Sequence, residues 1–204
     1  MRITTGLYKG RVIEMPHKIR PTQDKVRKAL FDILGDIEDL SFLELFAGSG
    51  AVGFEAVSRG VNDLTLVEYE PDCRRAIEKN IESLKLKTCT LYPQQAEKAI
   101  KNLHRAQRKF DIIFLDPPYS KGLFPRLRTP EDLRVGSGSR EGVGESLTKK
   151  TLQTLEAYDI VAPDGLIVVQ HFKKDALPDA LGDLTLLRQK KYGDTVLTFY
   201  RKGL

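Results

Sequence analysis

The chain has 204 residues, of which 41% are hydrophobic, so it is long enough to bury a substantial core and is not expected to be disordered. Its net charge of +5 favours an anionic partner. Residues 1–30 hold eight basic and two acidic side chains, a balance of +6, so the excess positive charge lies at the N-terminus. No segment approaches the roughly 20 apolar residues of a membrane span, and two cysteines cannot form a disulfide framework. We therefore expect a cytoplasmic monomer with no membrane span and no metal site.

Residues 1–40 are predicted to form a basic extension before a domain that covers residues 41–204. The runs RITTGLY and RVIEM flank Lys9-Gly10, a pattern that predicts a small β-hairpin. A helix is predicted over residues 23–34, where apolar residues recur at helical spacing after Thr22, a residue type favoured at the N-cap. Its apolar face should pack on the main domain. Its basic side chains are expected to lie mostly in solvent: Lys25, Arg27 and Lys28.

From residue 42 onward, short apolar runs alternate with helical patterns, which is typical of βα units and a largely parallel sheet. The predicted strands lie near residues 42–46, 64–68, 88–92, 111–115 and 165–170. The predicted helices lie near residues 51–59, 71–85 and 94–105. Two β-rich runs flank Gly193-Asp194 and predict a C-terminal antiparallel hairpin. Residues 120–147, with five glycines and two prolines, fit neither pattern and predict a long flexible loop.

A glycine loop, Gly48, Gly50 and Gly53 at the GxGxxG spacing, follows the first of these strands and opens the next helix. Glycines in this context let a ligand approach backbone N–H groups at the start of a helix. Glu68 lies 20 residues after Gly48, at the end of the next strand, where a carboxylate can accept both ribose hydroxyls. The loop therefore favours a binding site for an adenosine cofactor, either a dinucleotide or S-adenosylmethionine (SAM). The alternative interpretation is a glycine turn with a purely structural role.

The tetrapeptide Asp116-Pro117-Pro118-Tyr119 follows the fourth strand, at the edge where open α/β sheets bind ligands. Prolines lack N–H donors, so this loop presents carbonyl acceptors, to which Asp116 adds a carboxylate. Such acceptors can hold the hydrogens of an exocyclic base amine and localise its lone pair, while Tyr119 offers a face for stacking. The motif favours methyl transfer from SAM to a base amine, with alignment as the main catalytic contribution. The simpler alternative is a turn that ends the strand.

Five segments together resemble the RsmD family of bacterial 16S ribosomal RNA guanine-N(2)-methyltransferases: RIxxGxxKGR, RPT, LELFAGSGAVGFEAVSRG, DPPY and KKYGDTVLTFYRK. The resemblance implies a Rossmann-like class I SAM-dependent methyltransferase fold, with a mostly parallel seven-stranded sheet that ends in the C-terminal antiparallel hairpin. It also implies SAM as the cofactor and 16S rRNA or the small ribosomal subunit as the partner. The implied reaction is methyl transfer to the exocyclic N(2) amine of one guanine.

The motifs and the resemblance together assign candidate residues to three roles. The candidate catalytic residues are Asp116, Pro117, Pro118 and Tyr119. The candidate cofactor-binding residues are Phe46, Ala47, Gly48, Ser49, Gly50, Glu68, Gln95 and Asp116. The candidate RNA-binding residues are Arg2, Lys9, Arg11, Lys18, Arg20 and Thr22, of which the last two belong to the RPT motif.

Two features depart from the family pattern. Relatives usually place an acidic contact to the adenine amine after the third strand, where this chain has Gln94 and Gln95; the amide oxygen of Gln95 can accept the same hydrogen bond. Residues 123–146 look like an insertion after DPPY. They carry Arg126, Arg128, Arg134 and Arg140 and form either a lid that orders on RNA or a surface loop without a role.

Alternatives remain at this stage. DPPY serves any planar amine, so a DNA adenine or cytosine amine methyltransferase fits the motifs as well. An inactive methyltransferase-fold RNA-binding module is also possible because of Gln95. A dehydrogenase is disfavoured, since hydride transfer does not call for a Pro-Pro acceptor loop. Cys73, Cys89 and His171 are expected to be structural, and the basic N-terminus is expected to contact the RNA backbone rather than form a solvated face.

Overall fold

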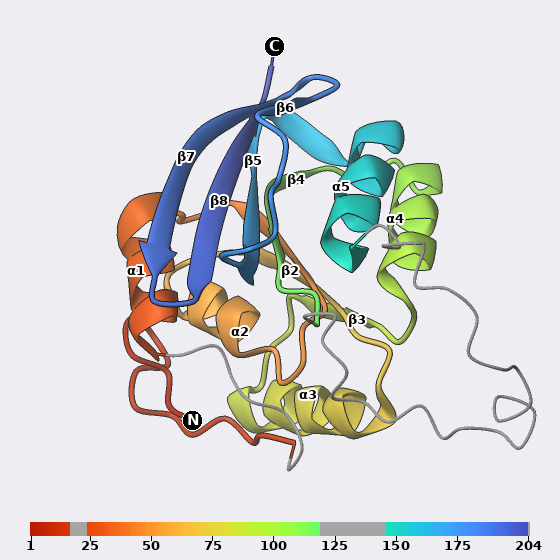
Figure 1. The fold of residues 1–204 in the computed structure, drawn as a ribbon. Helices are drawn as coiled ribbons and strands as arrows, with labels where there is room; N and C mark the ends of the chain where they lie inside the picture. The colour runs from red at the N-terminus through yellow and green to blue at the C-terminus, as the bar shows by residue number, and fades with distance from the viewer. Residues whose placement is uncertain (17–23, 119–145, 204) are drawn as a thin grey trace, which may run out of the picture.

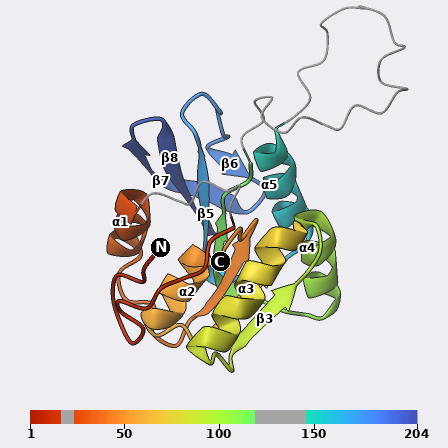
Figure 2. The ribbon, with the colours of Figure 1, turned by 90° about the horizontal axis from the view of Figure 1, so that it is seen from below.

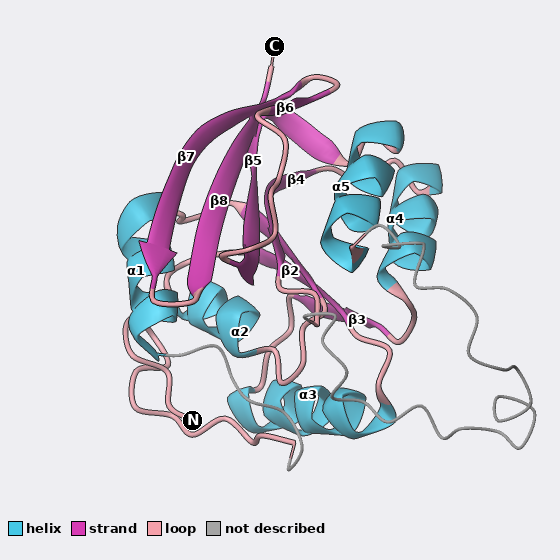
Figure 3. Cartoon of the chain, in the orientation of Figure 1, coloured by secondary structure: helices cyan, strands magenta, loops and turns pink. Residues whose placement is uncertain are grey.

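The computed structural model describes residues 1–16, 24–118 and 146–203 and arranges them around one central sheet (Figures 1 and 3). The helices are α1 (Asp24–Leu34), α2 (Ala51–Ser58), α3 (Pro71–Leu84), α4 (Ala96–Arg105) and α5 (Leu147–Ala157). The strands are β1 (Ser41–Leu45), β2 (Asp63–Val67), β3 (Cys89–Tyr92), β4 (Phe110–Leu115), β5 (Val161–Phe172), β6 (Ala180–Leu181), β7 (Leu184–Tyr192) and β8 (Thr195–Lys202). The alternation of strands and helices predicted from residue 42 onward is therefore confirmed.

The sheet has the strand order β3-β2-β1-β4-β5-β8-β7-β6. The first five strands are parallel, and β8 and β7 pair antiparallel, which confirms the C-terminal hairpin. The expectation of seven strands is wrong, because the described residues form eight. The additional strand is β6, whose Ala180 and Leu181 pair with β7. Two residues are too few for periodicity to indicate a strand.

Helices cover both faces of the sheet (Figures 1 and 2). One face is covered by α1, α2 and α3, whose Phe31, Phe54 and Ile77 belong to the same buried cluster as Phe42 of β1. The other face is covered by α4 and α5, which share a second buried cluster with β4 and β5. No helix among the described residues is long and apolar enough to cross a membrane.

Helix α5 is absent from the sequence-based prediction, although it supports β5. It begins at Leu147, the last residue of the predicted loop, and the Oγ of its N-cap residue Ser146 accepts a hydrogen bond from the Lys149 amide at 3.3 Å. Leu152 and Leu155 are its buried apolar residues. Four threonines and lysines at its start weaken its helical pattern. The rest of the predicted loop, and the predicted insertion up to residue 145, lies outside the described residues.

The predicted N-terminal hairpin is not shown as two regular strands: Arg2 and Val12 form one isolated antiparallel bridge, flanked by hydrogen bonds from the Ile3 amide to the Arg11 carbonyl at 3.0 Å and from the Ile13 amide to the Met1 carbonyl at 2.8 Å. Thr4 and Leu7, which lie between Arg2 and Val12, bond to α2. Glu55 accepts hydrogen bonds from the Thr4 amide and hydroxyl at 2.8 and 2.7 Å. The Leu7 amide donates to the Ser58 carbonyl at 2.8 Å, and these contacts remove the donors that a regular hairpin ladder would use.

The N-terminal segment approaches α2 so closely that Gly6 leaves no room for a side chain. Its φ is +80°, and a Cβ there would lie 1.6 Å from the Ser58 carbonyl oxygen. Ile3 and Ile13 are buried in the cluster that also contains residues of α1 and α2. The predicted extension of residues 1–40 thus shares a core with the sheet domain, and its separate role in RNA binding remains a prediction.

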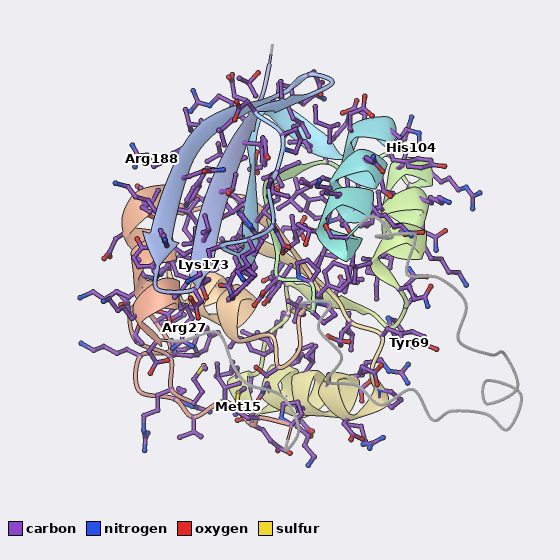
Figure 4. The ribbon with its side chains drawn as sticks, viewed as in Figure 1. Met15, Arg27, Tyr69, His104, Lys173 and Arg188 are labelled. Atoms are coloured by element: carbon purple, nitrogen blue, oxygen red, sulfur yellow. The ribbon has the colours of Figure 1, made fainter. Side chains whose placement is uncertain are left out.

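Arg27 of α1 is 1% exposed, so the expectation that it faces solvent is wrong, whereas Lys25 and Lys28 are exposed as predicted. Its guanidinium donates to the Arg2 carbonyl at 2.9 Å and lies 3.6 Å from the Glu55 carboxylate. Figure 4 shows Arg27 inside the molecule near α2, whereas Arg188 extends outward from β7. A buried carboxylate on a neighbouring helix explains this burial, and the local helix pattern does not reveal such a partner.

Candidate active site at the carboxyl edge of the sheet

The glycine loop joins β1 to α2 and has a left-handed backbone angle at every second position from residue 46 to residue 50. Phe46 has φ +60°, Gly48 +57° and Gly50 +74°. A positive φ is strained for a phenylalanine, and such strain is held where the surrounding structure fixes it. Here the Ala47 amide donates to the Val67 carbonyl at 3.0 Å, and the Gly50 amide to the Ala47 carbonyl at 2.7 Å. The loop is thus fixed before any ligand binds.

Gly50 and Gly53 are both required by packing, and Gly50 is also required by its backbone angle. A Cβ on Gly50 would lie 2.7 Å from the Phe54 ring. A Cβ on Gly53 would lie 2.7 Å from Leu66 and 2.8 Å from a Glu44 oxygen. The second glycine therefore lets α2 lie directly on β1 and β2, which brings the start of this helix to the sheet edge.

Glu68 is held against the glycine loop, as the 20-residue spacing predicts. Its Oε2 accepts the Gly48 amide at 2.7 Å, and its Oε1 accepts the Tyr69 and Glu70 amides at 2.7 and 2.8 Å. A carboxylate has about four acceptor positions, so at least one remains for a ribose hydroxyl. Tyr69 follows with 56% of its surface exposed, visible at the end of β2 in Figure 4, and its ring offers a face beside the same site.

Glu44 is a buried carboxyl under the glycine loop that sequence reasoning missed. Its Oε2 accepts the Gly53 amide at 2.7 Å. The pKa of Glu44 is raised to about 8, chiefly by burial and also by the negative charges of Asp116 and Glu68, which together outweigh the lowering effect of the Gly53 hydrogen bond. Glu44 is therefore mostly protonated near neutral pH. A charged residue in the apolar run FLELF was the available indication.

Gln95 is the N-cap residue of α4 and is exposed. Its side chain makes no capping hydrogen bond, so its amide oxygen is not used to begin the helix. Gln94 accepts a hydrogen bond from Asn102 at 3.2 Å and so turns toward α4. Of the two glutamines, Gln95 is thus the better candidate for a contact with an adenine amine.

Asp116, Pro117 and Pro118 follow β4, which pairs with β1 through Leu45 and Leu115. The Asp116 carboxylate accepts a hydrogen bond from the Gln170 amide of β5 at 2.6 Å. Pro117 is buried and Pro118 is exposed. The predicted Tyr119 lies outside the described residues. The structure therefore brings the acceptor motif next to the glycine loop, on adjacent strands.

Four polar side chains share one face at this edge: Glu44, Glu68, Asp116 and Gln170. Residues two apart on a strand face the same side of the sheet. The residues two positions before these four all belong to the buried cluster under α1 and α2: Phe42, Leu66, Phe114 and Val168. Sequence reasoning found Glu68 and Asp116 and missed Gln170, although a polar residue in the apolar run LIVVQHF was visible.

The basic residues predicted to bind RNA lie at the surface where they are described. Arg2, Lys9 and Arg11 are exposed. Arg2 donates to the Gly10 carbonyl at 2.8 Å, and Arg11 donates to the Ser83 carbonyl at the end of α3 at 2.7 Å. The remaining predicted contacts, Lys18, Arg20 and Thr22, lie outside the described residues.

The cysteines and His171 occupy structural positions. Burial raises the pKa of the Cys73 and Cys89 thiols to about 12, so neither is a thiolate nucleophile at neutral pH. Burial lowers the pKa of His171, whose Nε2 lies 2.7 Å from the Thr198 hydroxyl and whose Nδ1 lies 3.1 Å from the Phe172 carbonyl. His171 alternates with Gln170 along β5 and so faces away from Asp116.

This mostly parallel sheet with antiparallel C-terminal strands has SAM-dependent methyltransferases among its structural neighbours. A crystal structure of an RNA methyltransferase from Salinibacter ruber in complex with S-adenosyl-L-homocysteine has a TM-score of 0.60 at 13% identity, covering 90% of this chain and 94% of that one. At that identity the likeness concerns the fold alone. The protein is thus an α/β protein of the methyltransferase fold class.

The chain belongs to the family described as conserved hypothetical protein 95, whose model matches residues 1–131 and 144–201. The "Putative rRNA methyltransferase YlbH" of Bacillus subtilis is 32% identical over 99% of both chains. "Ribosomal RNA small subunit methyltransferase D" of Escherichia coli is 29% identical, covering 99% of this chain and 90% of that one. A solved structure, "Putative methyltransferase yhhF" from Escherichia coli, has a TM-score of 0.76 at 27% identity and covers 100% of this chain and 98% of its own. The resemblance inferred from the motifs is thereby confirmed at the level of the family.

Proposed function

We propose that this protein transfers a methyl group from SAM to the exocyclic N(2) amine of one guanine in 16S rRNA, as free RNA or within the small ribosomal subunit. The observation that supports this most directly is the position of the two loops. The glycine loop and the Asp116 motif follow β1 and β4, which pair in parallel through Leu45 and Leu115. The names of the curated relatives support rRNA as the substrate class.

The described residues fit SAM. The Glu68 carboxylate retains acceptor capacity beside the Gly48 amide, which suits a ribose hydroxyl. The glycine loop leads into the start of α2, where Gly50 packs so closely on Phe54 that a Cβ would collide with the ring. Gln95 offers an amide oxygen at the start of α4 for the adenine amine. These residues would hold the adenosine part of the cofactor.

When bound, SAM supplies a methyl group on a cationic sulfur, so the protein itself needs no nucleophile. Asp116 and the Pro117 carbonyl hold the hydrogens of the guanine amine, so that its lone pair is directed at the methyl carbon. The Asp116 carboxylate would accept the proton that the amine loses on methylation and would pass it to water. The high pKa of both cysteine thiols agrees with a direct transfer.

The experiment measures transfer from isotope-labelled SAM to small-subunit particles, naked 16S rRNA, DNA and bulk protein, followed by digestion to nucleosides. Label in N(2)-methylguanosine is the expected result, and comparison of particles with naked RNA identifies the preferred form. Asp116→Ala should remove most of the transfer activity, and the variant should still bind SAM. Label found only in DNA would show that the substrate is DNA and not rRNA. An absence of label from every substrate, with SAM bound, would favour a binding module.

A further inference from the structure

Gln170 is a buried amide within hydrogen-bond distance of the proposed catalytic carboxylate. It is 6% exposed, and its Nε2 lies 2.6 Å from Asp116 Oδ2. The other half of the amide, Oε1, is buried and has no hydrogen-bond partner among the described residues. Buried carbonyl oxygens are normally paired, because an unsatisfied one costs about 1–3 kcal/mol. Such an atom beside the site indicates a missing ligand group.

The orientation of this amide is fixed by its neighbour. If the amide were turned over, Oε1 would face the Asp116 oxygen, and two acceptors would repel each other at that distance. The carboxylate therefore requires Nε2 on its own side. As a result Gln170 can offer only an acceptor to a ligand held by Asp116, and it cannot switch to a donor.

The fixed acceptor distinguishes between the bases that carry an exocyclic amine. In guanine the amine lies between two ring nitrogens, N1, which carries a hydrogen and donates, and N3, which accepts, so an acceptor on the N1 side of the amine meets a donor. In adenine and cytosine the ring nitrogens next to the amine are N1 and N3, which have lone pairs and accept. An acceptor beside the amine-binding carboxylate is thus complementary to guanine and repels the other two bases.

We infer that Gln170 determines the specificity for guanine: Asp116 holds the amine and orients Gln170, and Gln170 Oε1 accepts the hydrogen of guanine N1. This role of Gln170 rests on the proposed function. It adds a contact that distinguishes guanine from the other bases, whereas the Asp-Pro-Pro-Tyr motif binds any planar amine. The two side chains come from adjacent strands, β4 and β5, which pair through Leu115 and Val169 directly before them.

The experiment compares guanosine with 2-aminopurine riboside, placed by ligation at the target position of an rRNA fragment that the protein methylates. Both bases carry the amine at C2, but 2-aminopurine has a lone pair at N1. The wild-type protein should methylate guanosine with at least about a tenfold higher kcat/KM. In Gln170→Leu the guanosine rate should fall about tenfold or more and the ratio should approach one.

Two further variants keep this test independent of folding. Gln170→Asn keeps an amide donor for Asp116 and an acceptor oxygen on a shorter side chain, and should retain more of the preference for guanosine than Gln170→Leu. Gln189→Leu changes an exposed glutamine on β7 and should behave as wild type. SAM affinity, measured by calorimetry, should be unchanged in all three. A Gln170→Leu protein that keeps the wild-type ratio would overturn the role of Gln170 and leave the proposed function in place. A wild-type protein that binds SAM but methylates no guanosine would instead overturn both.

Discussion

The side-chain amide of Asn80 in α3 lies 3.2 Å from the carbonyl oxygen of Ser49 and so joins this helix to the glycine loop. The same amide contacts Glu14 of the N-terminal segment twice: Nδ2 donates to the Glu14 carbonyl at 3.1 Å, and Oδ1 accepts the Glu14 amide at 2.8 Å. Asn80 is 2% exposed. One buried side chain therefore connects the segment that precedes the sheet with the loop that is expected to bind the cofactor.

Replacing Asn80 with leucine is expected to destabilise the protein and to weaken SAM binding. The change leaves the Glu14 amide and two carbonyls without their partner, and one such group costs about 1–3 kcal/mol. Urea unfolding measures the loss, and calorimetry of the folded variant measures SAM affinity. Asn62→Leu is the control, because Asn62 is exposed and its single side-chain contact to Asp39 is 3.4 Å long. Equal stabilities of the two variants would contradict a structural role for Asn80.

Glu44 should make folding stability depend on pH. Burial raises its pKa from 4.5 to about 8, so between these values the folded state binds a proton that the unfolded state has released. The stability of the folded state therefore falls as pH rises through this window, and no such loss occurs below it. Glu44→Gln keeps an oxygen for the Gly53 amide and cannot ionise. Its stability relative to wild type should thus increase from pH 5 to pH 8.

Unfolding of both proteins by urea across that pH range tests the difference directly. Glu38→Gln, at an exposed position, is the control and should follow wild type. A Glu44→Gln protein whose stability runs parallel to wild type at every pH would show that Glu44 is ionised in the folded state.

The parallel sheet and the position of the site could be predicted because both depend on local pattern. Apolar runs such as FDIIF predict buried strands, and strand ends determine which motifs meet at one edge. Glu68 was found because its distance from Gly48 along the chain reflects one βα unit. These features need no knowledge of what packs against them.

The errors arose where a distant partner decides the outcome. Arg27 was expected in solvent because helix periodicity cannot reveal Glu55, which lies on another helix. Two regular hairpin strands were expected because hydrogen bonds from Thr4 and Leu7 to α2 cannot be inferred from turn residues. Gln170 was missed for the same reason, since only the register of β4 and β5 places it beside Asp116.

Glu68 should contribute to SAM affinity through the carboxylate itself. The backbone amides of Gly48, Tyr69 and Glu70 all donate hydrogen bonds to the Glu68 carboxylate. Glu68→Gln replaces one carboxylate oxygen with an NH₂ group, which is a donor, so at least one of these amides loses its acceptor. SAM affinity is expected to fall about tenfold or more, because the remaining acceptor for ribose is also lost or misplaced. Calorimetry measures the change. Glu70→Gln, at an exposed neighbouring position, should bind as wild type, and equal affinity of both variants would remove Glu68 from the cofactor site.

The exposed basic residues of the N-terminal segment should control how RNA affinity depends on salt. A protein that neutralises phosphates releases counterions, so log affinity falls linearly with log salt concentration, by about 0.7–0.9 per phosphate contacted. Replacing Arg2, Lys9 and Arg11 with glutamine should make this slope shallower by up to about two to three, with weaker binding to 16S rRNA at low salt. Binding titrations at several salt concentrations measure it.

The matched control replaces three exposed basic residues of α4, Lys98, Lys101 and Arg105, on the opposite face of the sheet. It removes the same charge and should leave the slope close to wild type. Because Arg2 and Arg11 also bond to backbone carbonyls, both triple variants need unfolding curves to show that they remain folded. If the two variants shift the slope equally, the N-terminal residues act only through net charge and the RNA contact does not lie at this segment.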